Sequence, residues 1–456
     1  MGIVILIAFW TCVGLTGFNI GWKRAFIFAG LWVLGFFLFP IISPNDSSMH
    51  VNLSTNASED LSLPDPLTTS AGDLITTSAQ WQQERRPEIL ELFRSQVYGR
   101  TPDTDLTIRS TIFDLETNAL DGKAIRKQIA IEATSGEEHL RMNLLLYLPI
   151  SAQERPVPVM LILNFGGNHT IHSDPAIAIT TGYLREEYRP AEEFRGKREE
   201  RYPIEELLAR GYGIATANYG DIDPDFHDGF ENGIHPLFNT PNERSEESWG
   251  AVGAWAWGLS RFMDYLETDD DVDSSRVAVL GHSRLGKAAL WAGAQDERFA
   301  IVISNNSGCT GASISRHREG ESVTEINRNF PHWFCENYRQ YNDKESTLPV
   351  DQHMLISLMA PRPVYVASAD LDLWADPEGE FLSCVHAEPV YKLFGVDGMQ
   401  TEKMPVPNQP INEGHIGYHC RQGEHDLTRF DWICYMDFAD RHWKTGQIEN
   451  GEAPSN

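Results

Sequence analysis

Gly281-His282-Ser283-Arg284-Leu285-Gly286-Lys287 is the stretch of this 456-residue chain that decides its fold. It follows the apolar run Val277–Leu280 and leads into a helix-like segment at 288–292. A serine on a tight turn between a strand and a helix is the nucleophile elbow of serine hydrolases. Such a turn lifts the serine hydroxyl above the sheet edge and aims the N–H of Arg284 at a forming oxyanion, where the helix N-terminus adds positive potential. The motif therefore predicts that Ser283 is a nucleophile.

The elbow departs from its common form, G-x-S-x-G. Leu285 occupies the second small position, and the glycine falls one place later, at Gly286. A Gly-Ser turn without chemistry is the alternative interpretation. Because a strand, a turn and a helix occur together here, we favour the catalytic one.

Several later segments accompany this elbow in a fixed order. They are Asn305–Gly308, Phe330–Phe334, Leu348–His353, Ala360–Tyr365, Trp374–Pro377 and Gly423–Leu427. With these segments, the chain from about Trp81 to Trp443 resembles the glucuronoyl esterases, a carbohydrate esterase family whose elbow reads G-[CH]-S-R-x-G-K. The resemblance implies an α/β-hydrolase fold and the hydrolysis of glucuronic acid esters.

The pattern of the chain after Trp81 agrees with that fold. Apolar runs alternate with helical patterns, as an α/β sheet requires. A helix-compatible pattern covers Trp249–Leu266, and the strand-like runs are 144–148, 159–163, 213–217, 277–280, 299–303 and 364–367. We therefore predict one three-layer α/β-hydrolase domain at 79–446 with a mostly parallel central sheet, followed by a disordered tail at 447–456.

The composition narrows the possible partners. Aspartate and glutamate outnumber lysine and arginine by 65 to 37, which gives a formal net charge of −28. This charge argues against a nucleic acid or an anionic membrane surface as partner. Six cysteines in 456 residues are too few for a disulfide scaffold.

The N-terminal residues 1–43 are predicted to be a membrane anchor. Ile3–Ile20 and Ala25–Ile42 are apolar, each is near the length of a membrane span, and Lys23-Arg24 lies between them. If this basic pair stays in the cytoplasm, the catalytic domain lies outside it, in the periplasm or the extracellular space. A cleaved signal peptide, and hence secretion, is the alternative. Residues 44–78 are rich in Ser, Thr, Asn and Asp and are predicted to be a flexible linker.

A serine nucleophile needs a base, and in α/β-hydrolases the chain order is serine, acid, histidine. His425, in Gly423–Leu427, matches the family's histidine position and is the predicted base. His415 and His419 are the competing candidates. As a pair they also suggest a metal site, but no third ligand with suitable spacing accompanies them, so we expect neither a metal nor another cofactor.

The acid of the triad departs from the commoner family pattern. Many members of the resembled family place a glutamate where this chain has Asn306, whereas some bacterial members use an acid after the next strand. Asp370 and Asp372 follow that strand here. Asp372, two residues before the family's tryptophan, is the predicted acid, and Asp370 is the alternative. Because Asn306 and Asp372 would both face His425, we expect Asn306→Asp to be tolerated and to restore in part an Asp372→Asn enzyme.

The resemblance also implies roles around this triad. Arg284 would serve the oxyanion hole and contact the carboxyl ester, while Lys287, Glu321 and Trp374 would bind the hydroxyls and the ring face of a glucuronate. A tryptophan offers a sugar an apolar face and one hydrogen-bond donor. Gly166–His169 lies where α/β-hydrolases offer a second oxyanion donor.

The resemblance implies two cysteine bridges, of which this chain retains one. Cys309 and Cys384 lie where some members form a disulfide. The other frequent bridge joins the residue before the serine to the residue after the histidine, and these are His282 and Asp426 here. That bridge is absent, and a hydrogen bond between His282 and Asp426 is expected in its place.

The function expected from these features is the hydrolysis of (4-O-methyl-)glucuronic acid esters in glucuronoxylan-type polysaccharide or lignin-carbohydrate material. Two alternatives stay open. An esterase for acetyl or other carboxyl esters would need a smaller pocket and no use for Lys287 and Glu321. A carbohydrate-binding surface protein that has lost its activity is suggested by Asn306 in place of the glutamate.

Overall fold

The computed structural model of the chain describes residues 61–103, 106–185, 188–238 and 243–445. The two N-terminal apolar segments, residues 44–60 of the predicted linker and the predicted tail at 447–456 lie outside these described residues. Within the described ranges, no helix is both long and apolar enough to cross a bilayer.

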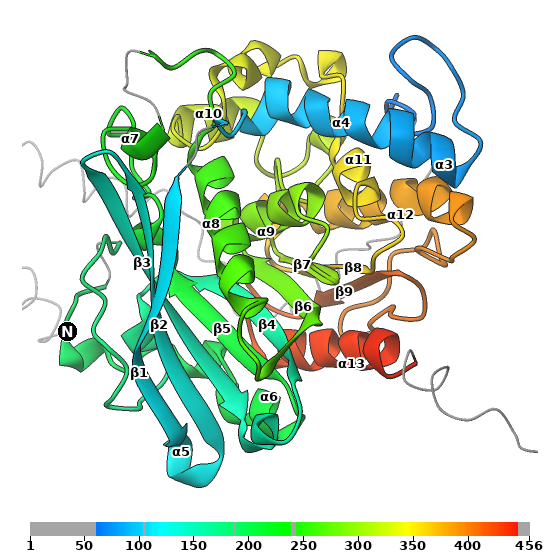
Figure 1. The fold of residues 1–456 in the computed structure, drawn as a ribbon. Helices are drawn as coiled ribbons and strands as arrows, with labels where there is room; N and C mark the ends of the chain where they lie inside the picture. The colour runs from blue at the N-terminus through cyan, green and yellow to red at the C-terminus, as the bar shows by residue number, and fades with distance from the viewer. Residues whose placement is uncertain (1–60, 104–105, 186–187, 239–242, 446–456) are drawn as a thin grey trace, which may run out of the picture. The chain divides into compact units, whose positions relative to one another are not determined.

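One mixed sheet organises this part of the chain (Figure 1). In spatial order its strands are β1 (Thr107–Asn118), β2 (Ala124–Ser135), β3 (Glu138–Pro149), β5 (Gly213–Asn218), β4 (Val157–Asn164), β6 (Val272–His282), β7 (Ile301–Asn305), β8 (Val364–Ala369) and β9 (Ile416–Arg421). The pairs from β1 to β5 are antiparallel, and all pairs from β5 to β9 are parallel. The prediction of an α/β domain with a mostly parallel sheet is confirmed.

Helices cover both faces of the sheet (Figure 1). The helices of the described residues are α3 (Ser78–Gln80), α4 (Arg86–Phe93), α5 (Ala119–Gly122), α6 (Ile204–Ala209), α7 (His235–Phe238), α8 (Ala251–Leu266), α9 (Arg284–Gln295), α10 (Val323–Asn329), α11 (Gln352–Ser357), α12 (Pro377–Leu393) and α13 (Arg429–Thr445). The helix predicted at Trp249–Leu266 is therefore α8, shorter by two residues at its start. The predicted strand-like runs fall in β3, β4, β5, β6, β7 and β8.

The two covered faces explain why the parallel strands appear in the sequence as unbroken apolar runs. In β6, Val277 and Val279 belong to the hydrophobic core shared with α4, α8, α9, α11 and α12. Ala278 and Leu280 point to the opposite face and join the core shared with α6 and α13. Alternate residues of one strand thus fill two separate cores.

The register of the parallel strands determines where the candidate site lies. His282 pairs with Asn305, Asn305 with Ala367, and Ala367 with His419, in a row across β6, β7, β8 and β9. All four strands end at this row or within two residues of it. The residues that follow them, including Ser283, therefore meet at one edge of the sheet.

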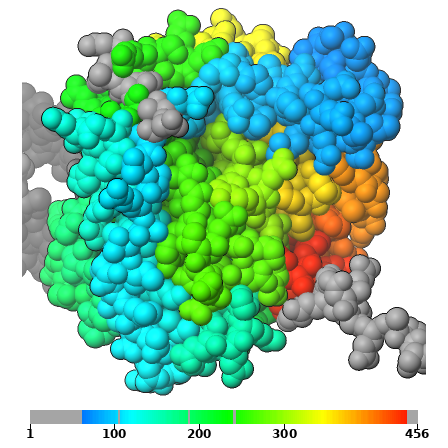
Figure 2. All heavy atoms as spheres, in the orientation of Figure 1, coloured from blue at the N-terminus to red at the C-terminus, as the bar shows by residue number. Residues whose placement is uncertain are grey.

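Residues 61–78, predicted to be the end of a flexible linker, instead pack on the domain. Ile75 is only 2% exposed. The carbonyl of Pro66 accepts a hydrogen bond from Arg85 Nε at 3.1 Å, and that of Pro64 lies 2.8 Å from His353 Nε2. Figure 2 shows this segment in blue against later parts of the chain in yellow and orange. The linker prediction is wrong for these residues because backbone carbonyls, which a polar composition does not reveal, make the contacts.

Candidate active site

Ser283 occupies a strained turn between β6 and α9. Its φ is 59° and its ψ −131°, a conformation that costs an L-residue about 1–3 kcal/mol and is typical of functional sites. Its N–H donates to Asn305 O at 2.8 Å. A Cβ on Gly281 would overlap the carbonyl of Leu285, and one on Gly286 would lie 2.9 Å from the Ser307 Cβ. Because the second glycine of the elbow motif lies at position 286, one place later than usual, α9 can pack closely on the loop after β7.

His425 and Asp372 form a short polar pair beside this turn. His425 Nδ1 lies 2.6 Å from Asp372 Oδ2, and Asn306 Nδ2 donates to the same oxygen at 2.8 Å. The histidine side chain is 43% exposed and the aspartate 6%. Burial acts to raise the pKa of Asp372, but the hydrogen bonds from His425 and Asn306 and the attraction of His425 outweigh it, so the pKa is lowered. Asp372 is therefore an ionised acceptor that can orient His425 and stabilise its cationic form.

The alternative acid and the alternative histidines point elsewhere. Asp370 Oδ1 accepts a hydrogen bond from the backbone N–H of Gly423 at 2.8 Å. His419 is fully buried, with Nε2 2.8 Å from Asp431 Oδ1. His415 instead packs its ring against that of His442, with the ring centres 4.9 Å apart and the ring planes tilted by 58°. Asp370 thus holds the backbone of the loop that carries His425, while His415 and His419 contact residues other than Asp372.

His282 supports the base from the other side. Its ring centre lies 4.6 Å from that of His425, and its Nδ1 lies 2.6 Å from Asn305 Oδ1. Burial lowers its pKa well below the ordinary value, so His282 is a neutral packing surface for His425. Asp426 pairs with Arg201 at 2.5 Å. The expected His282–Asp426 hydrogen bond is wrong because each of these side chains has another partner.

Arg284, at the first position of α9, is held by a carboxylate that the sequence analysis missed. Asp225 binds Arg284 Nη1 through Oδ2, and its Oδ1 accepts from His332 Nε2 at 3.0 Å and Trp333 Nε1 at 2.8 Å. Burial opposes ionisation of Asp225, but His332 and Arg284 hold its pKa well below the usual range. The guanidinium carbon lies 4.6 Å from the ring centre of Trp333. Arg284 is thereby fixed against an aromatic wall, next to the elbow.

Lys287, Glu321 and Trp374 lie together, as predicted, although Lys287 is less free than expected. Its ammonium is buried and donates to the carbonyls of Ser307, at 2.5 Å, and Cys309. Burial lowers the pKa of Lys287, and the charge of Glu321 opposes that change. Trp374 O accepts from the Glu321 N–H at 3.0 Å, while the Trp374 side chain is 53% exposed. Trp374 can therefore offer its ring to a ligand, and Lys287 also holds the loop after β7.

Glu380 in α12 is a second buried carboxyl that the sequence analysis missed. Its Oε1 accepts from Gly308 N–H at 2.9 Å. Its Oε2 lies 2.6 Å from Ser368 Oγ, which lies 3.0 Å from Tyr418 OH, and that hydroxyl lies 2.9 Å from Pro377 O. Each contact in this chain needs one hydrogen, and the two hydroxyl groups supply only two. A proton on Glu380 completes the chain, in agreement with burial raising its pKa to about 8.

The predicted disulfide between Cys309 and Cys384 is wrong. Both are buried free thiols. Cys309 Sγ lies 3.6 Å from Thr310 Oγ1. Burial raises the pKa of Cys309 to about 12 and raises that of Cys384 as well, so neither forms readily the thiolate that disulfide exchange requires. Cys335, Cys420 and Cys434 are also free and buried.

Gly166–His169 lies near the elbow, as expected for a candidate second oxyanion loop. The ring of the preceding Phe165 meets that of His282 edge to face, with centres 6.3 Å apart. Asn168 and His169 are themselves buried. The side chain of Asn168 donates to Asn143 O at 2.8 Å, so it is already bonded to the protein.

Comparison with known proteins gives this geometry a family. The family model "Glucuronyl esterase, fungi" matches residues 232–395. The carbohydrate esterase MZ0003, from an unknown prokaryotic organism, is 49% identical over 393 residues, which are 84% of this chain and 90% of that protein. A 4-O-methyl-glucuronoyl methylesterase from Schizophyllum commune is 27% identical over 347 residues, 73% of this chain and 74% of that protein.

Solved structures agree. A glucuronoyl esterase from Solibacter usitatus has a TM-score of 0.79 and 47% identity, covering 84% of this chain and 98% of its own. A promiscuous esterase of carbohydrate esterase family 15 (CE15), from a marine bacterial metagenome, has a TM-score of 0.78 and 48% identity, covering 83% and 96%. With this identity over most of both chains and the same fold, the chain belongs to the glucuronoyl esterase family, CE15.

Proposed function

We propose that this protein hydrolyses carboxyl esters of (4-O-methyl-)D-glucuronic acid through an acyl-enzyme formed on Ser283. The observation that carries the proposal is the short contact of 2.6 Å between His425 and Asp372, beside a serine in the strained elbow conformation. Family membership and the names of the relatives support glucuronic acid as the acyl part of the substrate.

In the proposed mechanism, Ser283 Oγ attacks the ester carbonyl while His425 Nε2 accepts its proton. Asp372 holds the opposite ring nitrogen and stabilises the imidazolium. The Arg284 N–H and side chain, with the positive end of α9, stabilise the oxyanion. His425 then gives this proton to the leaving alcohol. In the second step, His425 deprotonates a water molecule that attacks the acyl carbonyl, and it returns that proton to Ser283 Oγ as the acyl–oxygen bond breaks and glucuronate leaves.

We assign the sugar side of the substrate to Lys287, Glu321 and Trp374. The half-exposed Trp374 ring suits the apolar face of a pyranose. Glu321 would accept a hydrogen bond from a sugar hydroxyl; burial raises its pKa, and the charge of the neighbouring Lys287 opposes that change. Glucuronate esters of polysaccharide or lignin-carbohydrate material fit this arrangement.

A second candidate is activity on other carboxyl esters. The relative from the marine metagenome is a promiscuous esterase. In addition, Lys287 already donates two of its three ammonium hydrogens to backbone carbonyls, which leaves one for a sugar. Hydrolysis of acetyl or simple alkyl esters would need the triad but not the sugar contacts.

One paired assay on the full chain tests both candidates. We expect kcat/KM for benzyl or methyl glucuronate to exceed that for p-nitrophenyl acetate by at least about 10²-fold, because only the former gains the sugar contacts. Equal or better hydrolysis of the acetate would contradict glucuronic acid esters as the preferred substrate. Absence of both activities would favour the inactive carbohydrate-binding alternative.

We also propose that Ile3–Ile20 and Ala25–Ile42 anchor the catalytic domain to a membrane, with that domain outside the cytoplasm and its N-terminal boundary at or before residue 61. The sequence pattern carries this proposal. Protease added outside intact cells should digest the region after Pro44. Full-length protein found soluble in the cytosol would refute the anchor.

A further inference from the structure

The loop that carries His425 runs from 422 to 428, between β9 and α13. Its backbone is unusual at Gly423, where φ is 121°. Arg421, the last residue of β9, donates to three of its carbonyls: from Nη1 to Gln422 O at 3.2 Å, and from Nη2 to Glu424 O at 2.7 Å and Asp426 O at 2.8 Å. One guanidinium therefore binds the backbone immediately before and immediately after His425.

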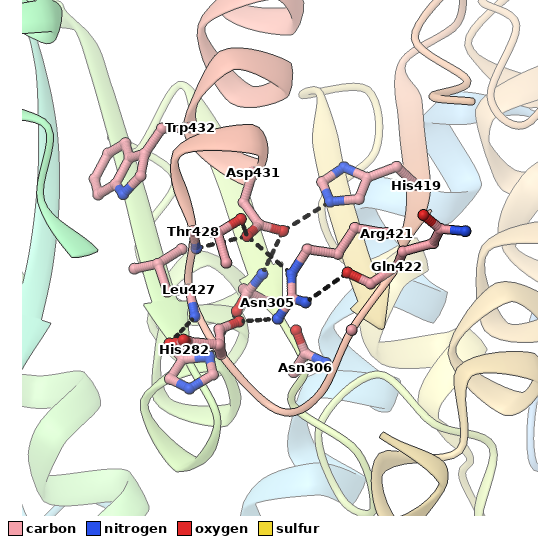
Figure 3. Close-up of polar contacts among 12 residues, drawn as sticks. His282, Asn305, Asn306, His419, Arg421, Gln422, Leu427, Thr428, Asp431 and Trp432 are labelled. Atoms are coloured by element: carbon pink, nitrogen blue, oxygen red, sulfur yellow. Dashed lines mark hydrogen bonds and ion pairs between the residues drawn. The ribbon is translucent and has the colours of Figure 1, made fainter. Parts of the chain in front are cut away.

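This guanidinium is itself anchored by Asp431 in the first turn of α13 (Figure 3). Asp431 Oδ2 lies 3.2 Å from Arg421 Nε and accepts from both the N–H and the hydroxyl of Thr428, each at 2.7 Å. Its Oδ1 lies 2.8 Å from His419 Nε2 and accepts from Asn305 Nδ2 at 3.2 Å. Asp431 thus joins Arg421, at the end of β9, to Thr428, the last residue of the loop.

The residues around Asp431 favour its ionised form. Burial acts to raise the pKa of Asp431, but hydrogen bonds from His419 and Thr428 and the charge of Arg421 outweigh it and lower the pKa. Tyr365 OH lies 3.0 Å from His419 Nδ1. His419 thus contacts Tyr365 through one ring nitrogen and Asp431 through the other. Arg421 adds the positive charge of a guanidinium in contact with Asp431.

A stability role alone does not account for this arrangement. Arg421 is 4% exposed and Asp431 fully buried, and the desolvation of a buried ion pair offsets most of its attraction, so apolar residues of similar volume often give equal stability. Apolar side chains, however, cannot bind carbonyls. The carbonyls of Glu424 and Asp426 are 2.7 and 2.8 Å from one nitrogen, which fixes the distance between the two residues that flank His425.

We propose that Arg421, held by Asp431, is a positioning residue for the catalytic histidine, which keeps the His425 ring between Asp372 and Ser283. This inference rests on the proposed function in its assignment of His425 as the base. Other contacts also hold the loop: Asp370 accepts from the Gly423 N–H, the Leu371 N–H donates to Gly423 O, Asn408 accepts from the Gln422 N–H, and Arg201 pairs with the Asp426 side chain. None of these contacts joins the two residues that flank His425. Displacing a catalytic group by about 1 Å can cost about 10²-fold in rate.

The test compares Arg421→Lys and Asp431→Asn with a matched control, Arg362→Lys. Arg362 is a partly buried arginine that likewise donates to backbone carbonyls, those of Phe299 at 2.8 Å and Gly293 at 2.7 Å, but it lies at the opposite ends of the strands. All three variants should lower Tm. We expect kcat to fall about 10-fold to 10²-fold only in the Arg421 and Asp431 variants, with KM within about threefold of the parent, when activity is normalised to active sites titrated by an acyl burst.

A second readout does not depend on the substrate. The proton shared by His425 Nδ1 and Asp372 should give a far-downfield ¹H NMR signal, which Asp372→Asn would remove and so assign. In Arg421→Lys this signal should shift or broaden, and in Arg362→Lys it should be unchanged. An unchanged signal together with an unchanged kcat in folded Arg421→Lys would overturn the inference. If the parent enzyme hydrolyses no ester, the proposed function fails while the signal still tests the positioning of His425.

Discussion

Replacement of Asp372 by asparagine is the sharpest test of the candidate triad. The carboxylate accepts from His425 Nδ1 at 2.6 Å and from Asn306 Nδ2 at 2.8 Å, both through Oδ2. An amide keeps the shape of this group but loses its charge. If its NH₂ faces His425, that ring nitrogen must become the acceptor, and Nε2 carries the proton that should come from the serine. The variant should therefore fold normally and lose turnover.

The magnitude follows from the geometry. Two unit charges about 4 Å apart attract by about 4 kcal/mol at an effective dielectric constant of about 20. Because the His425 side chain is 43% exposed, solvent screening reduces this attraction. We take about 3 kcal/mol as the attraction between Asp372 and cationic His425 that the variant loses, which corresponds to about 10²-fold in kcat. The wrong tautomer can add as much again, so the expected loss lies between about 10²-fold and 10⁴-fold, with KM nearly unchanged.

The assay is steady-state hydrolysis of benzyl glucuronate, with a burst titration to count competent sites. Asp370→Asn is the matched control, because Asp370 accepts from the Gly423 N–H rather than from His425, and its replacement should lower kcat less than about 10-fold. A kcat within about threefold of the parent for Asp372→Asn would refute the reasoning. If Asp370→Asn instead lost most of its activity in the same experiment, Asp370 would be the acid of the triad.

The same geometry revises what we expect of position 306. The sequence suggested that Asn306→Asp would be tolerated, but its Nδ2 donates directly to Asp372 Oδ2. A carboxylate there would face another carboxylate at hydrogen-bond distance and raise the pKa of one of them. We now expect Asn306→Asp alone to slow the enzyme. Only combined with Asp372→Asn, where an amide again faces a carboxylate, should it recover part of the activity.

Three further variants test the proposed roles of single residues. Ser283→Ala should lower kcat by about 10³-fold or more with the fold intact, and retention of a tenth of the activity would reject the acyl-enzyme. Trp374→Ala should raise KM for glucuronate esters about 10-fold without changing hydrolysis of p-nitrophenyl acetate, and a parallel change for both substrates would place Trp374 outside the sugar site. Because burial raises the folded-state pKa of Glu380 from 4.5 to about 8, the folded protein should lose stability relative to the unfolded chain as pH rises through that range. Glu380→Gln, which mimics the protonated acid, should therefore leave Tm unchanged near pH 4 and raise it near pH 8, and a lower Tm near pH 8 would show that the folded-state pKa of Glu380 is not raised.

The order of the parallel strands explains why part of the site could be predicted from the sequence. Ser283 follows β6, Asp372 follows β8 and His425 follows β9, and neighbouring parallel strands end at the same edge. Apolar runs identified these strands because both faces of the sheet are covered. Assigning a residue to a strand end therefore also predicts its position in space, and in the structure Asp372 lies 2.6 Å from His425.

Contacts between side chains and backbone could not be predicted in this way. Arg421 and Asp431 look like ordinary charged residues at the end of a strand and the start of a helix, and their meeting depends on the path of the loop between them. Asp225 belongs to an acidic stretch, 221–225, that would normally be a solvated turn. A small signal was present in its neighbour Pro224, which restricts the backbone at that turn.

The buried acids near the site differ in charge because their donors differ. Asp431 and Asp225 each contact a guanidinium, that of Arg421 or Arg284, and both have lowered pKa values despite burial. Glu380 is equally buried, but its hydrogen-bond partners are neutral hydroxyl and amide groups, and its pKa is raised. Burial alone thus does not decide ionisation; the presence of a cation in direct contact does.

Asp372 differs from these acids in the mobility of its partner's proton. The guanidinium partners of the other two ionised acids never release a proton at physiological pH, and they are 4% and 14% exposed. His425 is an imidazole, which can take up and release a proton, and it is 43% exposed, so it can exchange a proton with an ester and with water. The same carboxylate chemistry therefore fixes structure at Asp431 and Asp225 but supports catalysis at Asp372. For this reason we expect Asp431→Asn to lower both Tm and kcat, and Asp372→Asn to lower kcat with little change in Tm.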